Sequence, residues 1–465
     1  MSGFVTRLTN GLATGATARS ATVVVTFVYL MTVRTWGISD TFWLLGDQIR
    51  DWRLALLPFD QLPLTGPPSS VGGVGLGPIY YWTLWMCGLV IGPWVNNLPH
   101  AGGIGLSVMQ SVADCLLLAA IWKKSGSGCA AVALTLLVAT SPLDMALSAT
   151  IWNPVLSVAL VKLTLALLLL APSRPPLAWA VATTATGWLA VQAHSTAIFI
   201  AAPAIAAFVI PELAARNWKS ALGRAGASIG VVLLLQVPFM LHLALNGSVV
   251  SVGPTAVIGQ VSATAVAPDT IRVFDAFAAV ASATDFILLR PWNPAGTAVV
   301  LLIALVLAAY RCRGDWLLAS ASVLPVVAAT MGFAFWQLAY DQYWFLTLMP
   351  SVVLVFWNAL TARSRAAPLV GVVLVVVAVV AQPWRILDAH TFARLPAYGA
   401  LVRGSTEISR YTDEVTEIRV DFPLEPTTDR EFLYWILGGR VTPYAPFRAS
   451  IAPDGNATFT AVPQQ

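Results

Sequence analysis

Charged side chains are scarce in this chain, and their scarcity excludes most soluble folds. Lys, Arg, Asp and Glu together make up 10% of the 465 residues, whereas hydrophobic residues make up 57%. A soluble globular domain carries about 25% charged residues. The composition therefore predicts an integral membrane protein in which aqueous domains form only a minor part.

Cysteine is also rare, and its pattern excludes a disulfide framework and a zinc site. The four cysteines show no paired spacing, and each lies in or beside an apolar run. We expect all of them to be reduced. A dinucleotide-binding motif is absent as well, because GGVGLG at 72–77 precedes an aromatic segment and does not sit in a strand–turn–helix unit.

Long apolar runs are abundant, and eleven of them approach or exceed the roughly 17 residues that a membrane-spanning helix needs. They cover 19–36, 103–122, 128–146, 154–171, 178–194, 195–211, 225–243, 295–310, 316–333, 343–360 and 367–382. The first run has no convincing small-residue cleavage site after it, so we interpret it as a retained helix. The sequence predicts an all-α polytopic membrane protein with about eleven transmembrane helices.

Basic residues predict the orientation of these helices. We expect a plasma-membrane protein with its N-terminus in the cytoplasm. Every segment that connects two predicted helices on the cytoplasmic side (an inner link) is then basic, which is the positive-inside pattern. The inner links contain Lys123, Lys124, Arg174, Arg216, Lys219, Arg224, Arg311, Arg313, Arg363 and Arg365. This basic excess belongs to the membrane part and gives no reason to expect a nucleic-acid partner.

The same orientation predicts two outer regions. The first outer loop covers 37–102; its segment 78–94 would reverse the charge pattern if it crossed the membrane, so we expect an interfacial helix there. Residues 1–382 form the membrane module, and 383–465 form a small extracytoplasmic tail of mixed α/β structure. In the tail we expect helices at 397–411 and 429–438 and a strand at 417–422.

The first outer loop holds an unusual group of carboxylates. Asp40, Asp47 and Asp51 fall at i, i+7 and i+11, which would place them on one face of a single helix. Such a face can simply be solvated. Asp40, however, directly follows the first spanning helix and precedes Phe42 and Trp43, where an extracytoplasmic enzyme would hold a general base or a metal ligand.

Several short motifs resemble one family of membrane enzymes. They are the acidic residue after the first helix, the Pro-Pro loop, GPIYYW at 77–82, SATIWNP at 148–154, QAHST at 192–196 and YWFLTLMP at 343–350. In their order and spacing these motifs resemble the C-type membrane glycosyltransferases, in particular family 39. That family includes the protein O-mannosyltransferases and the aminoarabinose transferase of lipid A. The resemblance implies transfer of a sugar from a polyprenyl-phosphate donor.

The resemblance also implies roles for individual residues. Asp40 matches the catalytic acidic position and is expected to be the general base on the acceptor hydroxyl, with Asp47 as the second candidate. The family often shows Asp-Glu at this point, whereas Thr41 follows Asp40 here. Some members hold a divalent metal with an acidic residue where Asn153 stands, so we predict no metal ligand and leave a divalent metal open.

Other residues on the outer side could bind the substrates. A leaving phosphate requires cations, and Arg50, Arg53 and Arg290 are available for it, although each could equally anchor lipid headgroups. The candidates for contacts with sugar or acceptor are Tyr80, Tyr81, Trp152, Asn153, His194 and Tyr343. Structural roles compete with these assignments, since Asn153 and Pro154 suit a helix start. The acceptor could be a glycan, a lipid or a protein.

Two charges fall in the middle of apolar segments, Asp114 in 103–122 and Lys162 in 154–171. We expect them to form an ion pair between two helices, and the alternative is a proton or lipid path. A transporter or flippase for a lipid-linked saccharide is therefore the rival function. Internal repeats, which are common in transporters, are not evident in the sequence.

Overall fold

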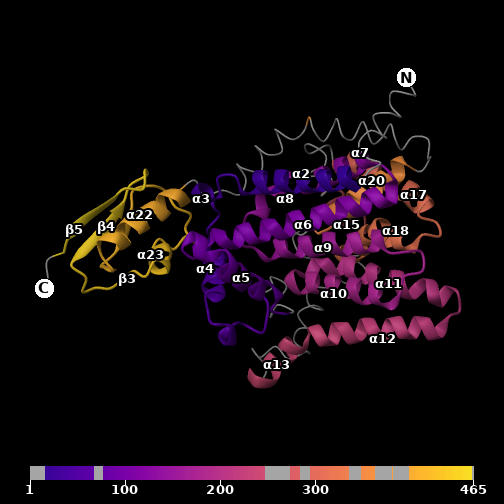
Figure 1. Cartoon of the computed structure of the whole chain (residues 1–465), viewed down its shortest axis with the longest axis horizontal. Helices are drawn as coiled ribbons and strands as arrows, with labels where there is room; N and C mark the ends of the chain where they lie inside the picture. The colour runs from indigo at the N-terminus through magenta and orange to yellow at the C-terminus, as the bar shows by residue number, and fades with distance from the viewer. Residues whose placement is uncertain are drawn as a thin grey trace.

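The structure, a computed structural model, describes residues 16–67, 77–246, 273–282, 294–334, 347–361, 380 and 397–462. Over these ranges the chain forms a long helical bundle that carries a small α/β domain at one end (Figure 1). The described residues thus have the mostly helical architecture that the sequence predicts, with a small sheet confined to the C-terminal domain.

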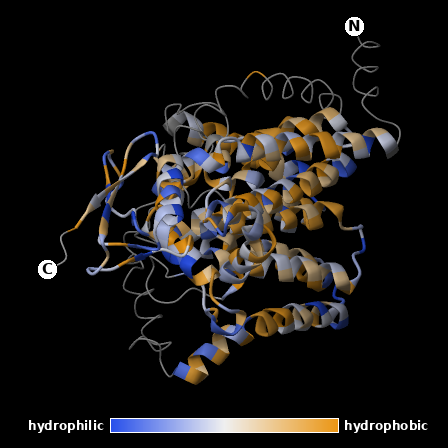
Figure 2. Ribbon diagram, turned by 60° about the vertical axis from the view of Figure 1, so that its left-hand side comes forward, coloured by the Kyte–Doolittle hydropathy of each residue, from blue (hydrophilic) through white to orange (hydrophobic). Residues whose placement is uncertain are grey.

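The bundle is built around α6 and α9, which pack against each other along its axis (Figure 1). Its described helices are α2 (Ala16–Thr35), α6 (His100–Ser125), α7 (Gly128–Ala139), α8 (Pro142–Ser148), α9 (Asn153–Leu170), α10 (Leu177–Ala193), α11 (Ile198–Ala214), α12 (Trp218–Leu235), α13 (Val237–Asn246), α15 (Val273–Ser282), α17 (Pro294–Arg311), α18 (Trp316–Ala321), α19 (Val323–Ala334) and α20 (Met349–Leu360). Many large apolar side chains of these helices are exposed, as expected for surfaces that face lipid. Hydrophobic residues are frequent along the helices of the bundle (Figure 2).

Four described segments are long and apolar enough to cross a membrane, namely Thr17–Thr41, His100–Ser125, Asn153–Leu170 and Ser195–Ala214. The pair α12 and α13, bent by 45° at Gln236, makes a fifth if it is counted as one span. The predicted number of eleven spans is therefore not confirmed. The predicted span 367–382 lies outside the described residues except for residue 380.

Several predicted spans are broken, and local chemistry explains two of the breaks. The predicted helix 128–146 divides into α7 and α8 because the Ser141 side chain caps a new helix by accepting a hydrogen bond from the amide of Asp144. The predicted helix 225–243 bends at Gln236, two residues before Pro238, which lacks an amide hydrogen. The predicted helix 316–333 is interrupted at Ser322, between α18 and α19.

The described part of 37–102, which the sequence predicts to be the first outer loop, folds into short helices at the end of the bundle that carries the C-terminal domain (Figure 1). These are α3 (Ile38–Thr41), α4 (Gly46–Ala55), the 3-10 helix η1 (Phe59–Gln61), α5 (Ile79–Val90) and the 3-10 helix η2 (Gly92–Val95). With 12 residues, α5 is about 18 Å long and too short to span a bilayer core of about 30 Å. Its position along the membrane interface remains a prediction.

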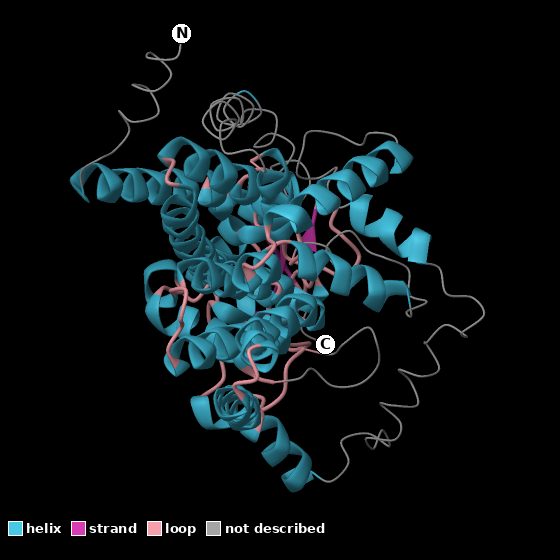
Figure 3. Cartoon of the chain, turned by 90° about the vertical axis from the view of Figure 1, so that its right-hand side faces the viewer, coloured by secondary structure: helices cyan, strands magenta, loops and turns pink. Residues whose placement is uncertain are grey.

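The C-terminal domain contains the three elements that the sequence predicts and four more. The predicted helices are α22 (Tyr398–Tyr411) and α23 (Phe432–Ile436), and the predicted strand is β2 (Ile418–Val420). The added strands are β1 (Glu414–Val415), β3 (Arg440–Val441), β4 (Phe447–Ile451) and β5 (Ala457–Ala461). Strand β4 pairs in parallel with β2 and in antiparallel with β5, while β1 pairs in parallel with β3. Helices account for most of the regular structure in Figure 3.

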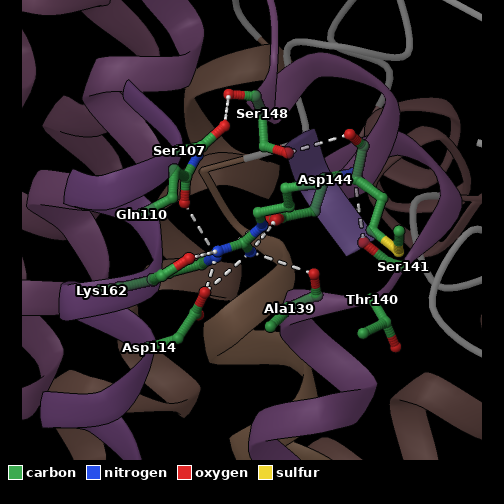
Figure 4. A network of polar contacts seen from close by, with 12 residues as sticks. Ser107, Gln110, Asp114, Ala139, Thr140, Ser141, Asp144, Ser148 and Lys162 are labelled. Atoms are coloured by element: carbon green, nitrogen blue, oxygen red, sulfur yellow. Dashed lines mark hydrogen bonds and ion pairs between the residues drawn. The ribbon is translucent and has the colours of Figure 1, made fainter. Parts of the chain in front are cut away.

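A buried network of four charges lies inside the bundle (Figure 4). The predicted pair is confirmed, because Lys162 Nζ lies 2.9 Å from Asp114 Oδ1. The network is larger than predicted: Asp144 contacts Lys162 at 2.7 Å, and Arg34 contacts Asp114 and Asp144 at 2.8 Å each. Two positive and two negative charges are thus enclosed together, and they join α2, α6, α8 and α9.

Candidate active site

A cavity of about 350 Å³ opens where the first outer loop, the link after α8 and the C-terminal domain meet. Its lining residues come from three distant parts of the chain and are Trp43, Leu45, Gly46, Asp47, Gln48, Leu147, Thr150, Trp152 and Thr427. The cavity therefore combines one carboxylate with two indole rings. Carboxylates perform acid–base chemistry, and indole faces stack well on the apolar faces of sugars.

Glycines on the first turn of α6 allow these parts to approach each other closely. A Cβ atom on Gly103 would collide with the carbonyl oxygen of Ala149, and one on Gly102 would collide with Ile151. Both collisions fall in the link between α8 and α9, which supplies Thr150 and Trp152 to the cavity wall. Small residues at this turn are thus required for the cavity to have its observed shape.

Helix α4 sets the position of Asp47. The helix begins at Gly46, and the amide of Leu45 donates a hydrogen bond to Gln48 Oε1. Asp47 thus lies in the first helical turn, where the helix dipole favours a negative charge. The Asp47 side chain is 61% exposed and accepts a hydrogen bond of 2.7 Å from Arg50 Nη1.

Asp51 lies one turn further along the same face of α4, but it is buried. Its side chain is 1% exposed, and one oxygen, Oδ1, accepts hydrogen bonds from Arg50 at 2.9 Å and from the Tyr81 hydroxyl at 3.2 Å. Burial raises the pKa of Asp51 to about 6, because removal from water penalises the carboxylate more than Arg50 stabilises it.

The predicted single helical face of three aspartates is wrong for Asp40. This residue belongs to α3, which ends at Thr41, and the four residues 42–45 that follow are not helical. Asp40 is 64% exposed and lies outside the cavity lining, with its Oδ1 3.5 Å from Arg403 Nη1 of α22. Only Asp47 and Asp51 share a helix.

Arg53 contacts the C-terminal domain. Its Nη2 lies 2.8 Å from Asp429 Oδ2, and its guanidinium lies over the rings of Phe432 and Trp435. The hydroxyl of Thr428 donates a hydrogen bond of 3.0 Å to the carbonyl oxygen of Leu44. These contacts hold the loop that contains Thr427 against the cavity.

Tyr80 and Tyr81 do not line the cavity; they belong to α5, which packs against α4. Both side chains are buried, and their ring centroids lie 5.5 Å apart. Tyr81 donates its hydroxyl hydrogen to Asp51, and α5 packs against both α4 and α6. In this structure the two tyrosines therefore fix α4 in place.

The remaining predicted site residues divide into three groups. Trp152 lines the cavity and is the N-cap residue of α9, a position that the sequence had assigned to Asn153. Asn153 donates a hydrogen bond of 2.8 Å to the carbonyl oxygen of Ala193, next to His194. His194 Nδ1 lies 2.7 Å from the hydroxyl of Thr196. Arg290 and Tyr343 lie outside the described residues.

The described residues contain no group of three or more His, Cys, Asp or Glu side chains arranged to hold a metal ion. Thr427 lines the cavity from a segment that the sequence did not connect to this site. It comes from the loop before α23, and no local motif connects that loop to the first outer loop. Gly46 shows how closely the two segments approach, because a Cβ atom there would lie 3.5 Å from Thr427 Cβ.

The bundle, the short helices of the first outer loop and the small terminal domain together form a fold that is also found in solved structures of another protein. Two solved structures show this likeness, and both are of ArnT from Cupriavidus metallidurans. The structure bound to undecaprenyl phosphate matches with a TM-score of 0.57, and the apo structure matches with 0.54. Each match has 14% sequence identity and covers 90% of this chain and 85% of ArnT. No family model and no curated protein sequence matches the chain.

Proposed function

We propose that this protein is a membrane glycosyltransferase that moves a sugar from a polyprenyl-phosphate donor to an acceptor in the cavity beside α4. The observation that carries the proposal is the group of Asp47, Trp43 and Trp152 around one cavity, in a chain that shares its fold with ArnT. The fold does not favour the rival function of a transporter.

In the proposed reaction Asp47 accepts the proton of the acceptor hydroxyl. The acceptor oxygen then bonds to the anomeric carbon, while the bond between that carbon and the phosphate oxygen breaks and leaves its electron pair on the polyprenyl phosphate. This displacement inverts the anomeric configuration. The cavity lining favours Asp47 over Asp40 as the base, and the assignment of Asp40 stays a prediction that paired variants can test.

The departing phosphate gains negative charge, which must be stabilised. The first residues of α4 line the cavity, so the helix N-terminus and its amide groups are available to an anion there. Arg50 adds a positive charge beside Asp47. Arg53 is less suited to this role, since Asp429, Phe432 and Trp435 already contact its guanidinium.

The proposal is tested with purified protein in lipid, a panel of radiolabelled polyprenyl-phosphate sugars and an extract of cell-envelope acceptors. At least one sugar should move from the lipid carrier to an acceptor, and Asp47→Asn should abolish most of that transfer. Asp60→Asn, which alters an exposed carboxylate in η1 of the same loop, is the matched control and should stay active. Failure of every donor with folded protein would reject the function.

A further inference from the structure

Asp47, Arg50 and Asp51 form a continuous chain of contacts that begins at the cavity and ends inside the first outer loop. Arg50 uses Nη1 for Asp47, at 2.7 Å, and uses Nε and Nη2 for Asp51, at 2.9 and 2.8 Å. The two carboxylates thus hold different edges of one guanidinium. Asp47 is exposed to the cavity, whereas Asp51 is buried.

We infer that Asp51 is a positioning residue: it anchors Arg50 so that the guanidinium stays beside Asp47 at the cavity wall. This inference rests on the proposed function, because it assigns a role toward the base of that reaction. Asp51 is too deeply buried to touch a substrate itself. Its effect on the reaction passes through Arg50.

The geometry explains why an anchor is needed. Arg50 is 40% exposed, and an arginine side chain at such a position has several rotatable bonds and many accessible conformations. Arg50 Nε and Nη2 both contact Asp51 Oδ1, so this edge of the guanidinium is tied to one buried oxygen by charge-assisted contacts. The Tyr81 hydroxyl in turn fixes the Asp51 oxygen that Arg50 uses, and Tyr81 belongs to the packed helix α5.

The anchor works only while Asp51 is ionised. The groups that face it are Arg50 and Asp47 from α4 and Tyr80 and Tyr81 from α5. Since burial raises the pKa of Asp51 to about 6, its protonation falls within the range of an ordinary activity assay. Below that pH the neutral carboxyl loses its charge attraction for Arg50, and the ion pair with the exposed Asp47 alone holds the guanidinium.

The experiment compares the parent protein with Asp51→Asn, Tyr81→Phe and the control Asp60→Asn. For Asp51→Asn we expect kcat at pH 7.5 to fall about tenfold, the acceptor KM to change little, and the loss of activity near pH 6 to disappear from the pH profile. Tyr81→Phe should cause a smaller fall in kcat and move that loss to a different pH. Asp60→Asn should match the parent throughout.

A second measurement does not depend on activity. Arg50 is modified with phenylglyoxal at pH 8, and the extent of reaction is read by mass spectrometry. Release from Asp51 should make Arg50 react severalfold faster in Asp51→Asn than in the parent or in Asp60→Asn. Unchanged reactivity of Arg50 in Asp51→Asn would overturn the inference, and so would an unchanged pH profile.

The two proposals can fail separately. If the parent transfers no sugar, the proposed function is rejected, while the reactivity of Arg50 still decides whether Asp51 anchors it. If Asp51→Asn instead loses thermal stability and yield with the same pH profile as the parent, Asp51 has a structural role alone and the inference is rejected.

Discussion

At the scale of single residues, the choice between Asp47 and Asp40 decides the chemistry. Sequence position favours Asp40, because it stands directly after the first membrane helix. The structure gives Asp47 the better surroundings, with a cavity on one side and Arg50 on the other, and leaves Asp40 beside Arg403 on an exposed edge. What separates the two is the cavity, because a carboxylate that lines it can meet a hydroxyl group bound there.

The variants Asp47→Asn and Asp40→Asn separate the two assignments. Each keeps the shape of the side chain and removes the base. We expect Asp47→Asn to lower the rate of sugar transfer about 10²-fold or more, with protein yield unchanged, and Asp40→Asn to lower it only severalfold. The measurement is the initial rate with saturating donor. Loss of activity in Asp40→Asn combined with near-normal Asp47→Asn would return the assignment to Asp40.

Asp51 also gives a prediction about stability and pH. Its pKa is about 6 in the folded protein, against 3.8 for an ordinary aspartate. The folded state therefore binds more protons than the unfolded state between these values, so this group makes the protein less stable as pH rises from about 4 to about 6. Asp51→Asn should remove that slope, which thermal unfolding followed from pH 4 to 8 can detect. A slope identical to that of the parent would contradict the pKa of Asp51.

At the scale of elements, the contact of α4 with the C-terminal domain, made by Arg53, can be tested next; it is called the joint below. The ion pair of Arg53 with Asp429 is partly exposed, with 48% and 37% of the side chains accessible, and such pairs contribute about 0–1 kcal/mol. The two aromatic contacts of Arg53 add about 0.5–1 kcal/mol each.

Arg53→Ala should therefore weaken this joint more than Asp429→Ala does, because Arg53 loses the ion pair and the ring contacts together. Limited proteolysis between the bundle and the C-terminal domain measures the difference, and Arg53→Ala should be cleaved faster. Arg430→Ala, next to Asp429 in sequence, is a suitable control. Equal cleavage of the Arg53 and Asp429 variants would show that the ring contacts contribute nothing.

Element boundaries show where sequence reasoning succeeds and where it stops. The helix Tyr398–Tyr411 could be predicted because its apolar residues follow a helical repeat. The hairpin of β4 and β5 was missed, although the turn between them contains Asp454-Gly455, a typical hairpin signal. The break between α3 and α4 could not be predicted, since the aspartate spacing alone suited one continuous helix.

Part of the candidate site could be predicted from the sequence, and part could not. The sequence located the first outer loop and Trp152, because loop carboxylates and the Trp-Asn-Pro motif are visible locally. Thr427 and the contact between Arg53 and Asp429 depend on two segments that are more than 350 positions apart, and no periodicity reports such contacts. Arg34 and Asp144 were missed because each sits near the end of its apolar run, where a charge looks ordinary.

At the scale of the whole molecule, variants of the four buried charged residues test whether the bundle tolerates a net charge in its interior. Removal of one member leaves an uncompensated charge in a region of low dielectric and should destabilise the protein by several kcal/mol. Asp114→Leu combined with Lys162→Leu leaves Arg34 paired with Asp144 and keeps the network neutral. That double variant should be more stable than either single variant.

The matched comparison is Asp114→Leu combined with Asp144→Leu, which also removes two charged groups but leaves two cations together. It should yield the least folded protein of the set, as measured by detergent-solubilised, monodisperse material. Equal yields from the two double variants would show that net charge in the network does not govern stability.

The cavity also has a consequence for the order in which the protein is made. Its wall contains residues of the segments 43–48 and 147–152 together with Thr427, and the ribosome reaches Thr427 only after it has made the helices in between. A nascent chain can therefore insert most of its helices while the wall of this cavity still lacks Thr427. The proposed sugar-transfer activity should therefore appear only after Thr427 has been made.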